Sequence, residues 1–217
     1  MTSPEPKPLP AVSRRSLMLA AGAASAALVR PAGAQEPAAE LTVTEALMAR
    51  RSTRAFADKA VDPALLAQLL WAAFGVNRPD SGLHTAPSWH GAADTVVRLA
   101  TAEGVLRYDP ATDTTQMVMA EDIRHQLSPE PFVATAPACL VLVSDLGKLT
   151  ATDKDDEKRL WALVDAAIVA ENVYLFAAGR GLGTCLVGGL DREAIIRSLG
   201  LGPQEFPTYL QPVGWPA

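Results

Sequence analysis

The sequence predicts an α+β fold of three layers, in which a mixed β-sheet is flanked by helices. Three features predict it. Helical and strand-like segments are mixed along the chain, residues 95–108 have the pattern of a β-hairpin, and residues 160–178 form one long apolar helix. A hairpin implies antiparallel strands, while helical crossovers join other strands, so the sheet is expected to contain both kinds of pairing.

The N-terminal segment has the organisation of an export signal. Residues 1–15 are polar and basic at their end, and residues 17–29 are apolar and rich in Ala. That apolar stretch is shorter than the roughly 20 residues that span a bilayer. Ala32-Gly33-Ala34 has the form of a cleavage site, which predicts a mature chain that starts at Gln35. An uncleaved anchor and a simple Ala-rich helix are the alternatives.

Ser13-Arg14-Arg15-Ser16-Leu17 resembles the twin-arginine signal, which addresses folded and often cofactor-loaded proteins to the periplasm. We therefore expect residues 1–34 to be a signal peptide and a periplasmic location for the mature protein, without stable membrane insertion. Residues 35–217 have the length of one domain with a sizeable core.

Charge and cysteine content narrow the class of partner. The whole chain carries a net charge of −5, and removal of the basic N-terminal segment makes it more negative. An acidic domain argues against nucleic acid and anionic membranes as partners. Cys139 and Cys185 have a separation that fits no metal site, and both lie in apolar strand-like runs. A disulfide between them stays possible in an oxidising compartment.

The first part of the domain contains two helices with clear start signals. Thr42 begins a capping box, which predicts a helix that ends at Ala49 or the next residue. Asp62 caps a second helix with Pro in its first turn, and Gly75 ends it. Residues 77–88 are rich in Pro, Gly, Asp and Ser and predict a loop.

The middle of the domain is expected to supply most of the sheet. Residues 95–100 and 105–108 predict the two strands of the hairpin, and residues 117–127 predict a short helix. The continuous apolar run at 138–144 is typical of a strand buried on both faces. Residues 148–158 predict a charged surface loop.

The last part begins with the longest helix, over residues 160–178, and ends with a strand over residues 209–213. Between them, residues 184–187 predict a strand, and Asp191 caps a short helix that ends at Gly200. The long helix carries an apolar stripe that we expect to face the core: Leu160, Leu163, Val164, Ala167, Ile168 and Leu175.

Arg50, Arg51 and Arg54 form a basic cluster with Ser52 where the first helix ends. Each guanidinium has five donors in a planar fork that suits a phosphate, and Ser52 adds a hydroxyl. An Arg-rich helix C-terminus that is favoured by the helix dipole is an equally simple explanation of the cluster alone.

Five signatures in a fixed order resemble the FMN-dependent nitroreductase family over residues 41–216. They are Arg50-Arg51-Ser52-Thr53-Arg54-Ala55-Phe56, Leu69-Leu70-Trp71-Ala72-Ala73-Phe74-Gly75 with Asn77-Arg78-Pro79, Thr85-Ala86-Pro87-Ser88, Gly181-Leu182-Gly183-Thr184 through Gly188-Gly189-Leu190-Asp191, and Pro212-Val213-Gly214-Trp215-Pro216. The resemblance is strongest to the branch related to the flavin dehydrogenases of thiazole- and oxazole-forming peptide synthesis.

The resemblance implies a homodimer with FMN bound noncovalently at its interface. It assigns the phosphate, ribityl chain and pyrimidine edge to Arg50, Arg51, Ser52 and Arg54. Pro87 and Ser88 would begin a loop that the partner subunit supplies. Gly188 and Gly189 would belong to the segment whose backbone N–H points at flavin N5. Glycine there would let the backbone approach the ring closely. A plain turn before the next helix is the alternative for these two glycines.

These features lead to the expectation of an exported FMN-dependent oxidoreductase that acts on a small organic molecule. Flavin N5 would carry the chemistry, so no catalytic side chain and no metal site are expected. NADH and NADPH are not expected in the periplasm, so a quinone or a redox protein is the expected electron donor. Trp89 lies in a loop where it would suit stacking on a ring.

A non-catalytic flavin- or anion-binding protein is the main alternative to the enzyme. Gly91 and Ala93 stand where most relatives carry Asn and Gln, and no Lys or Arg follows Pro212-Val213-Gly214. A purely structural dimeric domain is a third possibility.

Overall fold

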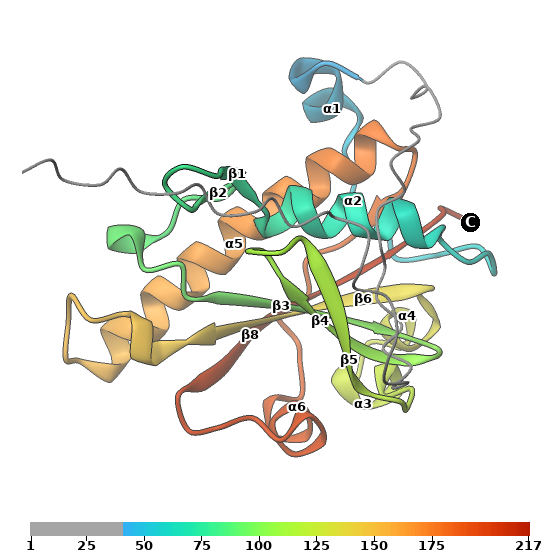
Figure 1. Ribbon diagram of the computed structural model, residues 1–217. Helices are drawn as coiled ribbons and strands as arrows, with labels where there is room; N and C mark the ends of the chain where they lie inside the picture. Colours follow the sequence, from blue (N-terminus) through green and yellow to red (C-terminus); the bar gives the residue numbers. More distant parts are fainter. Residues whose placement is uncertain (1–40) are drawn as a thin grey trace, which may run out of the picture.

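The computed structural model describes residues 41–217, and the predicted signal peptide at 1–34 lies outside the described residues. Six strands form the main sheet in the order β5-β4-β3-β6-β8-β7 (Figure 1). They are β3 (Thr95–Thr101), β4 (Gly104–Asp109), β5 (Thr114–Met119), β6 (Ala138–Asp145), β7 (Gly183–Thr184) and β8 (Glu205–Gly214). A separate two-stranded hairpin consists of β1 (Val76–Arg78) and β2 (Leu83–His84).

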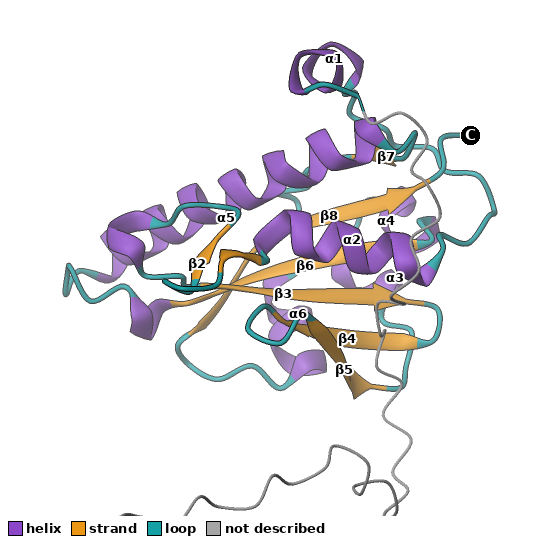
Figure 2. Cartoon of the chain, turned by 45° about the horizontal axis from the view of Figure 1, so that its top comes forward, coloured by secondary structure: helices purple, strands orange, loops and turns teal. Residues whose placement is uncertain are grey.

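Helices cover both faces of this sheet, which confirms the three-layer α+β prediction. The helices are α1 (Val43–Ala49), α2 (Pro63–Phe74), α3 (Arg124–Leu127), α4 (Pro131–Thr135), α5 (Asp155–Gly179) and α6 (Arg192–Leu199), with 3-10 turns η1 (Trp89–Gly91) and η2 (Leu146–Lys148). α2 and α5 lie on one face, and α3 and α6 on the other (Figures 1 and 2). All pairs of the named strands are antiparallel, and the parallel component is the isolated bridge between Ser52 and Thr184.

The start and stop signals in the sequence act where they were predicted. Thr42 and Glu45 form the capping box of α1, and the Asp62 carboxylate accepts from the N–H of Ala64 at the start of α2. The Asp191 carboxylate caps α6 in the same way, and Gly200 ends that helix with a left-handed φ of 57°. Each of these signals depends on residues within one turn of the helix end.

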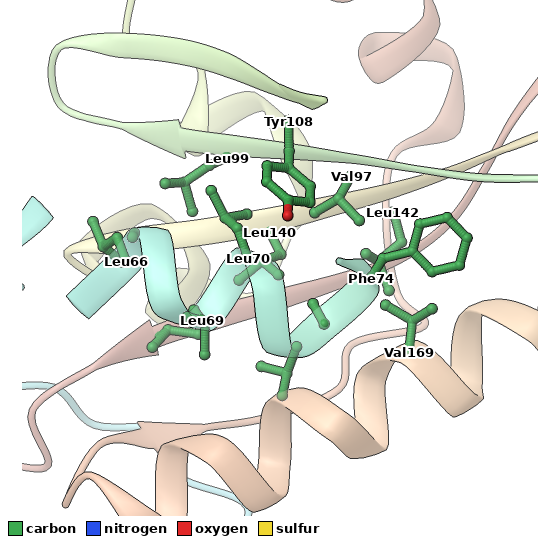
Figure 3. Close-up of a cluster of buried hydrophobic side chains, with 14 of the residues drawn as sticks. Leu66, Leu69, Leu70, Phe74, Val97, Leu99, Tyr108, Leu140, Leu142 and Val169 are labelled. Atoms are coloured by element: carbon green, nitrogen blue, oxygen red, sulfur yellow. The ribbon is translucent and has the colours of Figure 1, made fainter. Parts of the chain in front are cut away.

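The core lies between α2, α5 and the central strands (Figure 3). Leu69 and Leu70 of α2 are fully buried against Leu140 of β6 and Leu99 of β3. Because β6 pairs with β3 and β8 and is covered on both faces, residues 138–144 are all buried, as the continuous apolar run predicted. Burial of each leucine contributes about 1.5–3 kcal/mol to folding.

The predicted short helix at residues 117–127 is largely wrong. Residues 114–119 form the edge strand β5, which pairs with β4 across a tight turn in which Asp113 has a φ of 52°. Only residues 124–127 are helical. The sheet decides this region, because β5 alternates between buried and exposed positions along its partner strand.

α5 begins at Asp155, within the segment that was expected to be a charged loop. Three acidic residues, Asp155, Asp156 and Glu157, occupy its first turn, where the helix dipole favours negative charge. The predicted loop at 77–88 also contains the short hairpin β1–β2.

The apolar stripe predicted for α5 does not face the core. The residues of α5 that are buried are Ala162, Asp165, Ala166, Val169, Ala170, Val173 and Ala177. Leu160 is 54% exposed and Val164 38% exposed, while Ile168 packs at the margin of the core. Alanines lie inward because a small side chain lets the helix backbone approach the sheet closely. By length and composition α5 could also span a membrane, but this alanine face packs as in a core helix.

Candidate functional site

The Arg50–Arg54 segment lies beside the C-terminal half of α5. Arg50 is the C-cap of α1, and its guanidinium carbon lies 5.0 Å from the centre of the Tyr174 ring. The Ser52 hydroxyl lies 3.1 Å from the Tyr174 hydroxyl. The Nε of Arg50 is buried and has no hydrogen-bond partner within residues 41–217. A buried N–H group without an acceptor is costly, so a ligand that accepted from it would be favoured.

Tyr174 also ties this segment to the strand that follows α5. Its hydroxyl accepts from the N–H of Leu186 at 2.8 Å, and the N–H of Thr53 donates to the carbonyl of Thr184 at 2.8 Å. Gly183 makes this approach possible, because a Cβ there would lie 2.6 Å from the side chain of Thr53. The basic cluster is therefore fixed on the segment that leads to Gly188 and Gly189.

Tyr174 was not among the residues that the sequence predicted for the site. A single tyrosine among the small and apolar residues of the long helix was the signal that could have indicated it. The Tyr174 ring contacts the Arg50 guanidinium, and the Tyr174 hydroxyl contacts the Ser52 hydroxyl.

Arg51 and Arg54 are both exposed but differ in their contacts. Nη1 of Arg51 donates to the carbonyls of Met48 and Arg50 at 2.8 and 2.7 Å, so this guanidinium folds back over the end of α1. The Arg54 guanidinium makes no hydrogen bond or ion pair with another described residue. The Arg54 guanidinium and the Nε of Arg50 are therefore among the donors of the cluster that no described residue engages.

Gly188 and Gly189 are exposed, and the fold itself does not require glycine at either position. A Cβ at Gly188 would meet only Tyr209 at 3.9 Å, and one at Gly189 would meet nothing within 4 Å. Neither glycine has a positive φ. The backbone is nevertheless anchored, because the Ser128 hydroxyl donates to the Gly189 carbonyl and Val187 pairs with Leu210. Both readings of the two glycines, a plain turn and a close approach to a ligand, are compatible with this open backbone.

Pro87 and Ser88 lie at the other end of α5. The Ser88 hydroxyl accepts from the N–H of Ala93 at 2.8 Å, and the N–H of Trp89 donates to both carboxylate oxygens of Asp165 at 2.8 and 3.0 Å. The Trp89 ring stacks on Trp161 with centroids 5.2 Å apart. The ring that was expected to stack on a ligand is thus stacked on α5 in this structure.

The single chain does not bring Pro87 and Ser88 to the Arg cluster. Trp89, which follows Ser88, contacts α5 at Asp165, whereas the Arg cluster contacts it at Tyr174, nine positions further along the helix. Nine helical residues span about 14 Å. In the single chain, the two groups of predicted residues therefore lie at different positions along α5.

Two cavities in the described part of the chain lie away from the Arg cluster. One of about 960 Å³ opens between the end of α2, the β1–β2 hairpin and the sheet, and Phe74, His84 and Tyr108 are among its lining residues. The other, of about 340 Å³, lies between α1, α2 and α5. Neither is lined by any of the eight residues predicted for the cofactor, which lie on the open surface of a single protomer.

The described residues contain neither a disulfide nor a cluster of side chains that could bind a metal ion. Cys139 and Cys185 are both buried and unpaired, so the disulfide alternative is not formed in this structure. Burial raises the pKa of the Cys139 thiol to about 12. No group of three His, Cys, Asp or Glu side chains in residues 41–217 could hold a metal ion.

Comparison with known proteins gives a consistent family. A model described as the nitroreductase family matches residues 47–215. The protein named Putative nitroreductase MJ1384 from Methanocaldococcus jannaschii is 29% identical over 188 residues, which cover 81% of this chain and 91% of the relative.

Solved structures have the same fold. The crystal structure of a protein named putative nitroreductase, from Ralstonia eutropha JMP134, matches with a TM-score of 0.81 at 31% identity. The match covers 91% of this chain and 93% of the Ralstonia chain. A nitroreductase family protein from Streptococcus pneumoniae TIGR4 has a TM-score of 0.59 at 18% identity, covering 81% of this chain and 91% of its own. At that identity the second likeness concerns the fold alone.

Proposed function

The chain belongs to the nitroreductase family, and we propose on that basis that it is an FMN-dependent oxidoreductase. The observation that carries the proposal is the buried Nε of Arg50, which has no hydrogen-bond partner among the described residues. The exposed Arg54 guanidinium is also unpaired, and Gly188 and Gly189 leave space for a ligand near their backbone. When bound, FMN would supply hydride or electron transfer through N5 to or from a small organic molecule.

Arg50, Ser52 and Arg54 would hold the phosphate end of the cofactor. Tyr174 orients the Arg50 guanidinium through its ring and the Ser52 hydroxyl through its own hydroxyl, so two donors are fixed before any ligand arrives. Such preorganisation lowers the entropy that binding costs. Arg51 contributes positive charge nearby, while its Nη1 is engaged with backbone carbonyls.

Gly188 and Gly189 would present backbone N–H groups to the ring. No described group accepts a hydrogen bond from either N–H, and a Cβ would meet only Tyr209, at 3.9 Å from position 188. A fixed backbone donor aimed at a ring nitrogen would stabilise charge that develops there. The chain's own contribution to the reaction is therefore binding and orientation, with no catalytic acid or base among the predicted residues.

We also propose that the functional unit is a homodimer. Leu160 and Val164 form an exposed apolar row on α5, and Met48 of α1 is 72% exposed. In the arrangement that the family resemblance implies, a second copy would supply Pro87 and Ser88. In light scattering, Val164→Lys should give a monomer that no longer retains FMN. Ile196→Lys, on the opposite face of the sheet and equally exposed at 38%, should leave the dimer intact.

The experiment that tests the cofactor is an absorption spectrum and FMN titration of the purified protein. We expect about one FMN per chain, bleached by dithionite. Arg50→Gln and Arg54→Gln should each raise the Kd for FMN by about 10–100-fold, the loss of roughly 1.5–3 kcal/mol of charge-assisted hydrogen bonding. Arg197→Gln, an exposed arginine on α6 that pairs with Glu193, is the matched control and should bind FMN normally.

Absence of flavin together with no uptake of added FMN would overturn the proposal. Bound FMN that dithionite reduces but no acceptor reoxidises would favour the non-catalytic binding protein instead. Reoxidation by quinones or nitro compounds at a catalytic rate would favour the oxidoreductase. Dehydrogenation of a small molecule or peptide is the reaction that the resemblance to the thiazole- and oxazole-forming branch suggests.

We propose further that the protein is exported by the twin-arginine route and takes electrons from a quinone or redox protein. The proposal rests on Arg14-Arg15, on the apolar run at 17–29 and on the scarcity of NADH and NADPH expected in the periplasm. Replacement of Arg14 and Arg15 by Lys should keep the protein in the cytoplasm in a fractionation experiment. A strong preference for NADH or NADPH in turnover would contradict the proposed donor.

A further inference from the structure

We propose that the buried carboxyl groups of Asp94 and Asp165 together position the loop of residues 87–93, so that the hold on this loop is released as pH rises. The pair lies outside the eight residues predicted for the cofactor. Its effect on the flavin site rests on the proposed function, whereas the change in the loop itself can be measured without any ligand.

Both carboxyl groups are enclosed by the core. Asp94 is fully buried just before β3, and Asp165 on α5 is 2% exposed. The Ser144 hydroxyl of β6 donates to one oxygen of Asp94, and the other oxygen of Asp94 accepts no hydrogen bond from a described residue. The side-chain carboxyl groups of Asp94 and Asp165 are close enough to interact by hydrogen bond and by charge.

Asp165 is the residue through which the pair acts on the loop. Both of its oxygens accept from the backbone N–H of Trp89. The loop also depends on Ser88, whose hydroxyl accepts from the N–H of Ala93, and on the stacking of Trp89 against Trp161. These contacts connect one short loop to α5.

The loop needs such anchors because its backbone is strained. His90 and Ala93 have φ values of 50° and 48°, in the left-handed region that residues with a Cβ disfavour, and Gly91 has a φ of 71°. A left-handed residue other than glycine costs of order 1 kcal/mol or more and persists only where its surroundings hold it. Weakening of the anchors should therefore change the conformation of this loop before that of the sheet.

The charges around the pair do not neutralise it. Burial first of all, and then the hydrogen bond and negative charge of Asp165, raise the pKa of Asp94 to about 7, against the opposing effect of the Ser144 hydroxyl. On the neighbouring η2 the Lys148 ammonium donates to the carbonyl of Ala93, and at the end of β6 the Asp145 carboxylate accepts from the N–H of Gly147.

The remaining elements that pack around the pair bring no compensating cation to it. In η1, His90 is exposed and lies edge-on to the Trp89 ring. Arg98 of β3 is paired with Glu205 of β8. At low pH, the proton on Asp94 thus removes a like-charge contact with Asp165 that no ion pair of the described residues compensates.

Loss of that proton places two carboxylates together in a dry site. Asp165 is fixed on α5 and Asp94 on the end of β3, so the least costly relief is movement of the strained loop, which admits water to both groups. Opening returns Asp94 to its ordinary pKa near 4. Because each unit of pKa difference between the closed and open loop multiplies the opening constant by about ten, opening should increase at least about tenfold between pH 5 and pH 8.

Hydrogen exchange of residues 87–93 in the ligand-free full chain tests the proposal. After correction for intrinsic exchange, protection should fall at least about tenfold between pH 5 and pH 8, and the fluorescence of stacked Trp89 and Trp161 should change over the same range. Asp94→Asn, which keeps the shape of the neutral acid, should make both signals independent of pH. Glu171→Gln, an exposed acid on the same helix, should leave the pH dependence unchanged.

Ser144→Ala gives a second test that keeps both carboxyl groups. Because the Ser144 hydroxyl lowers the pKa of Asp94, its removal should move the midpoint of the transition to higher pH. Protection that stays constant from pH 5 to pH 8 in the wild type, or an unchanged transition in Asp94→Asn, would overturn the proposal. Hydrogen exchange and fluorescence need no flavin, so the loop proposal can hold even if the FMN titration fails. A protein that binds FMN but has a pH-independent loop would refute the loop proposal and leave the proposed function intact.

Discussion

The hydroxyl groups of Ser52 and Tyr174 lie 3.1 Å apart, although 122 positions separate the two residues in the chain. Their contact joins the basic cluster to the long helix, and the N–H of Leu186 completes it from the strand side. Three segments that are distant in sequence are thus fixed at one point, and the proposed phosphate site is built around that point.

Removal of the Tyr174 hydroxyl should weaken the site while preserving the fold. In Tyr174→Phe the ring still contacts the Arg50 guanidinium, but the Ser52 hydroxyl and the N–H of Leu186 lose their hydrogen-bond partner. We expect a loss of about 1 kcal/mol in the free energy of unfolding and a Kd for FMN about tenfold higher. Urea denaturation and flavin titration measure these effects. Tyr209→Phe is the control, and an equal effect there would remove the special role of Tyr174.

Gly183 and Gly188 should respond differently to the same substitution. In Gly183→Ala the new Cβ would lie 2.6 Å from the side chain of Thr53, so we expect a loss of about 1–3 kcal/mol in unfolding free energy. The double variant with Thr53→Gly removes the atoms that clash and should recover part of that loss. Thermal unfolding followed by circular dichroism provides the measurement, and a fully stable single variant would contradict this account.

Gly188→Ala should leave stability unchanged within about 0.5 kcal/mol, because its Cβ would enter open space. The same substitution should reduce FMN binding if the cofactor approaches the backbone there. Comparison of the unfolding curve with the FMN titration separates the two effects. Tight FMN binding by this variant would mean that the ring lies elsewhere.

The stability of the folded protein should depend on Asp94. Its pKa is raised in the folded state, mainly by burial, so its contribution to stability is complete below about pH 4 and is lost as pH rises through about 7. The free energy of unfolding should therefore fall by at least about 1 kcal/mol over that interval from this group alone, the value of one unit of pKa. Asp94→Asn should remove that part of the slope in urea titrations from pH 4.5 to pH 8, and an unchanged slope would contradict the assignment.

The sequence predicted those elements whose signals are local. The caps at Thr42, Asp62 and Asp191 each depend on a side chain that meets the backbone two or three residues away, and all three helices start there. The strand at 138–144 was equally clear, since an apolar run without charged residues is typical of a strand covered on both faces. The predicted helix over 117–127 was wrong because the edge of the sheet, which no local signal reveals, recruits residues 114–119.

The sequence by itself determined the three-layer fold class, the boundaries of α1, α2 and α6, and the presence of a basic cluster with a nearby hydroxyl. Only the tertiary structure decided which face of α5 is buried, because close packing against the sheet selects its alanines over Leu160 and Val164. It alone brought Tyr174 to Ser52 and Asp165 to Asp94. Such contacts depend on how the chain returns across the sheet, and their energy comes from burial and from partners that lie far away in sequence.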